Sequence, residues 1–590
     1  MYPEKFIYKF VYRLLNAILI LSITIVYLMD NVLHSIKKTE QEAGDWARAT
    51  LSSMTVEQKI GQLFMVSDLT PSARAGIAET DWTQLPYNTG SNYIEKLIRE
   101  YHIGGIIFLG KNGSPIDQVH MTHNYNQMSK IPLLIGLDAE WGLAMRLNNT
   151  TIQFPKNMTL GAISNQKMCY AVGKEIGQQC IKLGVHINFA PVVDVNTNPN
   201  NPVIGARSFG QDKQEVAQRA IEYMHGLLDA GVIPCAKHFP GHGDTSIDSH
   251  YDLPIIIHDY SRIEDIELYP FKQLIAAKIP AIMTAHLNVP SLTAHKESPE
   301  PVTLSKEILN QILFKKMKFS GLVITDGLGM QALTNYYEPG ELELKAFLAG
   351  NDILLCPVDV PKAFNLITQA VKEKKITEEE LNQRVLKILY AKEWALHNKK
   401  SEPINSFDEA SLISTDALEL KRQLYTQAIT LVCNYQNTLP LVHDDDEYEL
   451  ITVGTLENNT DFQKAISQKF TLKKIQLEHL EHSTKTLLVA IYPDCKTPQQ
   501  ISSEIQNIVK NILAGHRPCI LTYFTNPYAL CSLQDTLEQR AAPTALVIAY
   551  EDDIDAQIAA AHTIMGLHKP TGKLPVTAGA YNVGTGQTYY

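Results

Sequence analysis

The chain has 590 residues, of which 45% are apolar and 19% are charged, and its formal net charge is -11. This length and balance predict a globular protein with more than one domain and sizeable cores. The negative charge and the lack of a long basic run in the body argue against nucleic acid as a partner.

The first 45 residues, 1–45, are predicted to form an N-terminal membrane anchor or signal helix and a linker. Basic residues precede an apolar run at 14–29, which is the layout of an export signal or an anchor. No small-residue cleavage site follows closely, so an uncleaved anchor is favoured over a cleaved signal peptide. We therefore expect a membrane-anchored body on the periplasmic or cell-surface face, or a secreted body if the segment is cleaved.

Residues 46–397 are predicted to form a (β/α)8 barrel, the TIM barrel. Eight apolar runs alternate with segments of helical spacing such as 166–183, 213–230 and 263–278, and unbroken apolar runs are typical of parallel strands buried on both faces. A doubly wound open sheet is the alternative, disfavoured because no GxGxxG pattern follows the first strand. The predicted strands span 62–66, 103–109, 132–137, 185–191, 233–238, 280–284, 322–325 and 352–355.

Residues 398–590 are predicted to form a second domain, a three-layer α/β sandwich. A linker at 398–405 precedes a helix at 416–429, after which short apolar strands alternate with helices. The domain has no cluster of ionisable residues like those of the barrel, so we expect it to pack against the barrel or shape one wall of the site. The predicted strands span 449–453, 486–492, 520–524 and 545–550, and the helices 498–514 and 554–565.

Ionisable residues end or directly follow five of the predicted barrel strands. Because the carboxyl ends of barrel strands share one face, these side chains are expected to converge on one pocket. A single aspartate after a strand more often caps a helix, but capping explains five such positions poorly. The residues are Asp138, Asp194, Lys237 with His238, His286 and Asp326.

The stretch KHFPGHGDTSIDSH at 237–250 gathers three histidines and two aspartates at the end of the fifth strand. A buried core segment has no need of such a cluster, so a functional loop is predicted. A polar loop without function is one alternative. A metal site is another, because His238 and His242 are four residues apart.

That stretch, together with ITDGLGM at 324–330, resembles the glycoside hydrolase family 3 enzymes. More narrowly, it is similar to their β-N-acetylglucosaminidase (β-hexosaminidase) branch, in its two-domain type. Further matches are GLDAEWGLAMR at 136–146 and NPVIGARSFG at 201–210 in the first domain, and TNPYAL at 525–530 in the second. The resemblance covers nearly everything after residue 50.

The resemblance implies roles for particular residues. Asp326 matches the catalytic nucleophile, and Asp248 and His250 match a dyad in which the histidine is the acid/base and the aspartate orients it. The residues that match those holding the hydroxyls of the terminal sugar are Asp138, Arg207, Lys237 and His238.

Two departures from the family pattern accompany these matches. Trp141 stands where the family usually has a small residue, and Gly327 and Gly329 leave the segment after the nucleophile unusually free of side chains. Both are expected to alter the fit of the sugar or of its neighbour.

The matches predict a retaining, exo-acting β-N-acetylhexosaminidase that removes terminal N-acetylglucosamine from peptidoglycan fragments (muropeptides) through a glycosyl-aspartate intermediate. Retention needs an attacking carboxylate and an acid for the leaving oxygen, and histidine suits the second role because its unperturbed pKa lies near neutrality. No metal and no cofactor is expected. The alternatives are a β-glucosidase or xylosidase, a glycoside phosphorylase and a non-catalytic glycan-binding protein.

Overall fold

The computed structural model describes most of the chain from residue 45 onward. No helix within the described ranges is long and apolar enough to cross a membrane, and the predicted anchor at 14–29 lies outside those ranges. The described residues are 45–75, 91–148, 150–249, 251–293, 300–398, 407–441, 447–454, 460–477, 485–494, 501–515, 517–533, 542 and 544–589.

Eight parallel strands form a nearly closed barrel, which confirms the fold predicted for the first domain. The strand order is β7-β6-β5-β4-β3-β2-β1-β8, and a bridge between Ile324 and Ile353 brings β7 against the residue before β8. Every residue of these strands is buried, which is why they are unbroken apolar runs in the sequence. The strands are β1 (Phe64–Asp68), β2 (Gly105–Phe108), β3 (Leu134–Leu137), β4 (Ile187–Asn188), β5 (Ile233–Phe239), β6 (Ala281–Thr284), β7 (Leu322–Thr325) and β8 (Leu354–Leu355).

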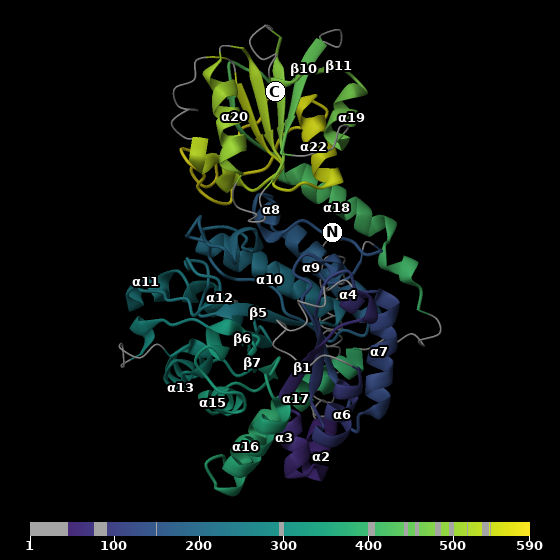
Figure 1. The fold of residues 1–590 in the computed structure, drawn as a ribbon, viewed down its shortest axis with the longest axis vertical. Helices are drawn as coiled ribbons and strands as arrows, with labels where there is room; N and C mark the ends of the chain where they lie inside the picture. Colours follow the sequence, from purple (N-terminus) through teal and green to yellow (C-terminus); the bar gives the residue numbers. More distant parts are fainter. Residues whose placement is uncertain are drawn as a thin grey trace, which may run out of the picture.

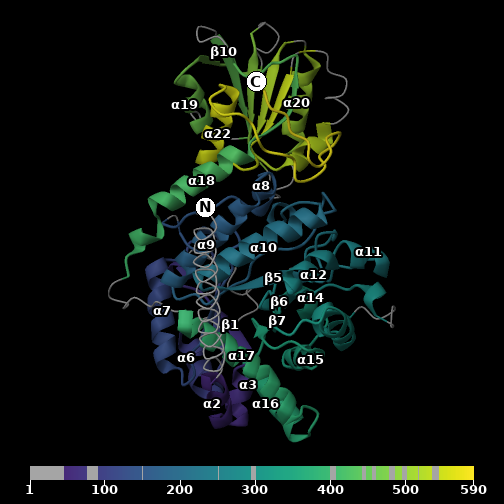
Figure 2. The same cartoon turned by 180° about the vertical axis from the view of Figure 1, so that it is seen from behind.

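Helices surround this barrel, as Figure 1 and the reverse view in Figure 2 show. Local signals fix their ends: Asp212 caps α10 by accepting from two backbone N–H groups, and Gly231, at φ 91°, ends it. The helices are α2 (Asp45–Ser53), α3 (Val56–Gly61), α4 (Pro71–Ala75), α6 (Ser91–Tyr101), α7 (Pro115–Met128), α8 (Asn157–Gly161), α9 (Lys167–Lys182), α10 (Lys213–Ala230), α11 (Tyr260–Asp265), α12 (Leu268–Ala276), α13 (Lys306–Ile308), α14 (Gln331–Thr334), α15 (Glu341–Ala349), α16 (Val360–Lys372) and α17 (Glu378–Asn398).

The single helix predicted over 263–278 is wrong, because the structure has two helices there, α11 and α12. Pro270 lies in the first turn of α12. A proline is tolerated in a first turn, where its missing N–H would have no partner within the helix, but it breaks a helix interior. The apolar residues keep their helical spacing across the break between α11 and α12, so the spacing by itself predicted one continuous helix.

A six-stranded sheet forms the core of the second domain, with all neighbours parallel except β14 and β9. Alternate residues of β12 belong to two separate cores: Leu487 and Val489 pack with α20, and Leu488 packs with α19 and α22. Helices therefore cover both faces of the sheet, as Figure 1 shows. The elements are α18 (Thr415–Ala428), β9 (Thr430–Tyr435), β10 (Glu447–Val453), α19 (Asp461–Ser467), β11 (Thr471–Lys474), β12 (Leu487–Ile491), α20 (Ser503–Ala514), β13 (Cys519–Tyr523), β14 (Thr544–Ile548) and α22 (Ile554–Ile564).

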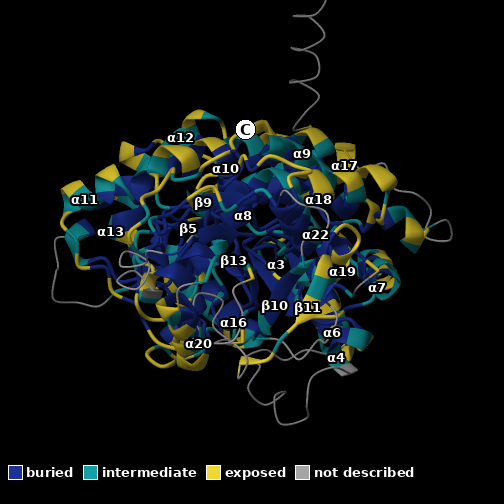
Figure 3. Ribbon diagram, turned by 90° about the horizontal axis from the view of Figure 1, so that it is seen from above, coloured by how far each residue is buried: buried dark blue, intermediate teal, exposed yellow. Residues whose placement is uncertain are grey.

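The two sheets lie on either side of residue 398, where the sequence predicts the domain boundary. The second domain rests on the barrel near α8 and α9, with α18 beside both helices (Figure 1). Seen from above, buried residues fill the interior and exposed residues mark the outer faces of the helices (Figure 3).

Candidate active site

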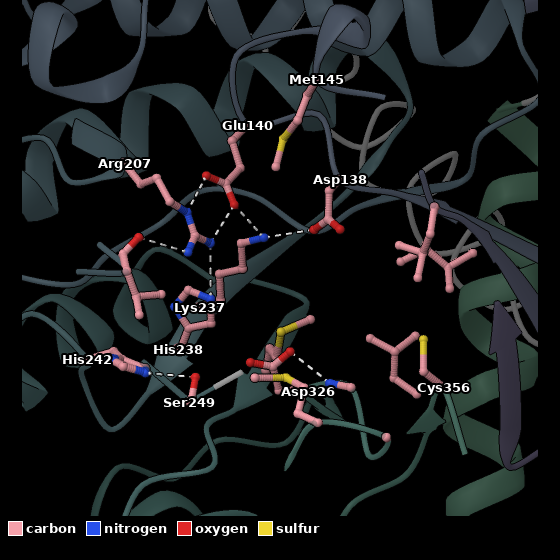
Figure 4. Close-up of a pocket in the computed structure, with 18 of the residues that line it drawn as sticks. Asp138, Glu140, Met145, Arg207, Lys237, His238, His242, Ser249, Asp326 and Cys356 are labelled. Carbon is pink, nitrogen blue, oxygen red and sulfur yellow. Dashed lines mark hydrogen bonds and ion pairs between the residues drawn. The ribbon is translucent and has the colours of Figure 1, made fainter. Parts of the chain in front are cut away.

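A pocket of about 930 Å³ opens at the carboxyl ends of the barrel strands. Its lining includes Ile107 and Met283 from β2 and β6 and, from the strand ends and loops, residues predicted to meet there (Figure 4). The predicted residues that line it are Asp138, Arg207, Lys237, His238 and Asp326. The parallel topology therefore brings together side chains from four different stretches of the chain.

Buried ion pairs organise one wall of this pocket. Lys237 donates to Asp138 at 2.8 Å and lies 2.7 Å from Glu140, and Arg146 pairs with the other oxygen of Asp138 at 2.5 Å. Arg207 binds Glu140 through two parallel bonds, of 2.7 and 3.0 Å. Such two-bond pairs hold a guanidinium in a fixed plane.

Charge pairing keeps these carboxyl groups ionised. Burial by itself raises the pKa of Asp138, but the Lys237 and Arg146 charges outweigh it and hold that pKa well below its usual value. Burial likewise opposes the charge on Glu140, yet Arg207 and Lys237 lower its pKa to about 2. At neutral pH the wall therefore presents fixed hydrogen-bond acceptors beside fixed donors, which is what sugar hydroxyls require.

Asp194 does not line the pocket but orients His238 from behind. Its carboxylate lies 2.7 Å from His238 Nδ1 and accepts from the backbone N–H groups of His238 and His242. His238 Nε2 lies 3.3 Å from a nitrogen of Arg207, which can only donate. The imidazole therefore carries its proton on Nδ1 and accepts at Nε2.

Asp326 follows β7 and points into the pocket opposite the ion-pair wall (Figure 4). Its backbone N–H donates to Thr284, and its carboxylate accepts from the N–H of Gly327 at 2.8 Å. His286, the polar residue after β6, is buried and contacts the Gly327 carbonyl at 2.9 Å and the Thr303 hydroxyl at 2.8 Å. His286 thus braces the peptide that follows Asp326 instead of facing the pocket.

The loop after β5 reaches the pocket through His242 and Ser249. The two ring nitrogens of His242 lie 2.8 Å from the Thr245 hydroxyl and 3.2 Å from the Ser249 hydroxyl. Burial and the neighbouring His238 lower the pKa of His242 to about 4, so its ring is neutral at pH 7.

The predicted dyad lies on the same loop. The carbonyl of Asp248 accepts from the N–H groups of Tyr251 and Asp252, and Asp248 is not among the residues that line the pocket. Ser249 and Tyr251, its neighbours further along the chain, do line it. His250 lies outside the described residues.

Two lining residues, Glu140 and Arg146, have no role in the sequence interpretation although both are in the matched stretch at 136–146, and a third, Trp141, was expected only to alter the fit of the sugar or of its neighbour. Glu140 and Arg146 complete the ion-pair wall, and Trp141 lines the pocket with the Lys156 ammonium 5.6 Å from the centre of its ring. The spacing could have indicated Glu140, because it is two residues beyond Asp138 and lies in the same turn after β3.

Comparisons with known proteins agree with this geometry. The model of "Glycosyl hydrolase family 3 N terminal domain" matches residues 55–391. "Beta-hexosaminidase A" of Pseudoalteromonas piscicida is 32% identical over 433 residues, covering 67% of this chain and 70% of the relative. "Beta-N-acetylglucosaminidase/beta-glucosidase" of Cellulomonas fimi is 26% identical over 420 residues, covering 70% of each chain. A solved family 3 β-N-acetylglucosaminidase from Paenibacillus sp. str. FPU-7 is 27% identical with a TM-score of 0.73, covering 89% of this chain and 99% of that one.

Proposed function

The chain belongs to glycosyl hydrolase family 3, and from this premise we propose that it is a retaining, exo-acting β-N-acetylhexosaminidase. Membership and a glycoside hydrolase activity agree with the sequence expectation. The observation that carries the finer proposal is the pocket in which Asp326 faces the wall of Asp138, Lys237 and Arg207. The names of the relatives in the hexosaminidase branch support N-acetylglucosamine as the sugar.

In the proposed mechanism, the carboxylate of Asp326 attacks the anomeric carbon and forms a glycosyl-aspartate while the leaving oxygen takes a proton from His250. His250 then removes a proton from water, which attacks the same carbon and releases Asp326. Asp248 orients the imidazole and stabilises its charged form. The position of Ser249 and Tyr251 at the pocket supports placing this dyad beside the leaving group.

In this proposal the residues of the ion-pair wall bind the sugar. Asp138 accepts and Lys237, Arg207 and Arg146 donate, while His238 Nε2 adds an acceptor. No step in this scheme requires a metal or a cofactor. We propose peptidoglycan fragments as the natural substrate, on the sequence resemblance to the branch that trims them.

The His250→Gly variant tests the acid assignment. With aryl β-N-acetylglucosaminides that have poor leaving groups, we expect kcat/KM to fall by about 10²–10⁴-fold, because general acid help is lost. With a highly activated leaving group kcat/KM changes little, since no proton is needed. Unchanged turnover of the poor leaving groups by this variant contradicts the assignment.

The wild-type enzyme separates the alternatives with a panel of aryl β-glycosides. Faster cleavage of the glucoside or xyloside than of the N-acetylglucosaminide favours a β-glucosidase or xylosidase. A rate that rises with phosphate and yields a sugar phosphate identifies a phosphorylase. Binding of muropeptides without cleavage of any substrate identifies a glycan-binding protein.

The N-terminal segment supports a separate proposal about location. We propose that the apolar run at 14–29 anchors the protein in a membrane with the body on the extracytoplasmic side, because basic residues precede the run. Alkaline extraction of membranes should leave the full-length protein in the pellet. Its release into the supernatant, with a shortened N-terminus, identifies a cleaved signal peptide instead.

A further inference from the structure

One motif of the second domain, TNPYAL at 525–530, has no part in the proposed chemistry. It follows β13 and places Tyr528 at the boundary with the barrel, where the residue is 6% exposed. Asn526 fixes the local turn by accepting from the Tyr528 N–H at 3.0 Å. The hydroxyl of Tyr528 is thus presented to the first domain from the short 3-10 helix, Pro527–Leu533, that follows β13.

That hydroxyl meets Asn196, on the barrel segment that follows β4. The Asn196 side-chain amide donates to the Tyr528 oxygen at 2.7 Å, and the hydroxyl lies 3.4 Å from the Asn196 carbonyl, to which it donates. The second N–H of the amide donates to the carbonyl of Asn198 at 3.2 Å. Asn196 is 1% exposed, so water cannot replace a lost partner there.

The same barrel segment supports the loop after β5. Asn198 donates to the carbonyl of Thr245 at 3.0 Å and to the Ser246 hydroxyl at 3.2 Å. Asn201 donates to the carbonyl of His242 at 2.8 Å.

Gly243 shows how closely the loop rests on this segment. A Cβ at Gly243 would lie 1.9 Å from the Val195 carbonyl oxygen, so only glycine allows the approach. The segment 195–201 is therefore in direct backbone contact with the loop.

We propose that Tyr528 is a positioning residue, through which the second domain holds the loop of the acid/base dyad at the pocket. The path runs from Tyr528 through Asn196 and Asn198 to the loop, whose Ser249 lines the pocket one residue before His250. The inference rests on the proposed function, in which that loop supplies the acid. The second domain then contributes to leaving-group protonation without providing any group that touches the sugar.

Tyr528→Phe tests this with the loss of a single hydroxyl. We expect kcat/KM for aryl β-N-acetylglucosaminides with poor leaving groups to fall roughly tenfold, because a small displacement of an acid is costly. For the most activated leaving group the change should stay within about twofold, since that reaction needs no proton. Asn198→Ala, which removes the contacts from the barrel side, should give the same dependence on the leaving group.

Thr577→Val is the matched control. Thr577 also belongs to the second domain, and its hydroxyl accepts from Gln211 of the barrel at 3.0 Å, but within the described part of the chain neither of these side chains bonds to Asn196, Asn198 or the loop. This variant should match the wild type with every leaving group. If Tyr528→Phe behaves like Thr577→Val, or loses activity equally with all leaving groups, the positioning role is overturned.

His250→Gly, assayed beside them, distinguishes failure of the positioning role of Tyr528 from failure of the acid assignment of His250. If it loses activity only with poor leaving groups while Tyr528→Phe does not, the inference about Tyr528 falls and the proposed function stands. If His250→Gly retains wild-type activity with poor leaving groups, the acid assignment is wrong, and so is the positioning role of Tyr528 that rests on it.

Discussion

At the scale of single residues, Glu140 links the two cations that the family resemblance assigns to sugar binding. It accepts two bonds from Arg207 and contacts Lys237 at 2.7 Å, and its side chain is 1% exposed. A cation bound to a fixed carboxylate has its remaining N–H groups aimed in one direction. Glu140 is therefore placed to orient both cations without itself being the nucleophile or the acid.

Glu140→Gln is expected to impair both binding and stability. Removing one partner from a buried ion-pair network typically costs about 3–5 kcal/mol, because the remaining charges stay buried without compensation. We expect a free energy of unfolding lower by that order, and a kcat/KM reduced at least about 100-fold through loss of fixed geometry. Denaturant unfolding and steady-state kinetics measure the two effects.

Glu100→Gln is the control for that prediction. Glu100 pairs with Lys96 one turn away on α6, and both side chains are more than half exposed. An exposed pair of this kind contributes about 0–1 kcal/mol. Equal behaviour of the two glutamine variants contradicts a special role for Glu140.

At the scale of elements, α9 and α10 pack so closely that their glycines are required. A Cβ at Gly226 would lie 2.2 Å from the carbonyl oxygen of Tyr170, and one at Gly173 would lie 2.2 Å from that of Tyr223. The predicted helices at 166–183 and 213–230 agree closely with the observed ones. Periodicity thus located both helices, but the glycines alone did not indicate which helices touch.

Gly226→Ala should destabilise the protein. Overpacking costs about 1–3 kcal/mol, and the better helix propensity of alanine returns only about 1 kcal/mol of it. We expect a lower midpoint of thermal unfolding with kcat/KM unchanged at low temperature. Gly515→Ala, where the new Cβ would lie 3.3 Å from the nearest atom, should leave the midpoint nearly unchanged. Similar midpoints for both variants argue against a tight crossing.

At the scale of the whole molecule, Glu551 joins the two domains from the end of β14. It is buried and accepts from the N–H of Lys156 at 2.8 Å and from the hydroxyl of Thr159 at 2.6 Å, both through the same oxygen. Burial raises its pKa, although the Lys156 charge and these hydrogen bonds oppose the shift. A carboxyl group with a raised pKa carries an electrostatic cost at the domain boundary at neutral pH.

Glu551→Gln should remove that cost, because an amide oxygen can accept both bonds. In the wild type the folded state binds a proton that the unfolded state has released, from pH about 4.5 up to the raised pKa. The cost therefore grows as pH rises through that window and is complete above it. We expect the variant to unfold at a higher temperature than the wild type at pH 7.5, with the difference vanishing toward pH 4.5.

Glu504→Gln, on an exposed face of α20, serves as the control and should follow the wild type at each pH. A difference for Glu551→Gln that stays constant from pH 4.5 to 7.5 contradicts the ionisation argument. A difference that widens toward low pH contradicts its sign.

The barrel, and several of the residues at its mouth, could be predicted from the pattern of apolar and ionisable residues. Strands buried on both faces leave unbroken apolar runs, and parallel topology brings their carboxyl ends to one face. Asp138, Lys237 and Asp326 were therefore predicted together without any contact being known. The edge strand β11 was not predicted, because its sequence TLKK is mostly exposed and has no apolar pattern.

Which side chains act on one another became known from the folded structure alone. Asp194 and His286 follow strands as Asp138 does, yet one orients His238 and the other braces the residue after Asp326. The contact of Tyr528 with Asn196 joins positions 332 residues apart. Contacts at such separation leave no periodic trace in the sequence, because they depend on how two separate sheets pack together.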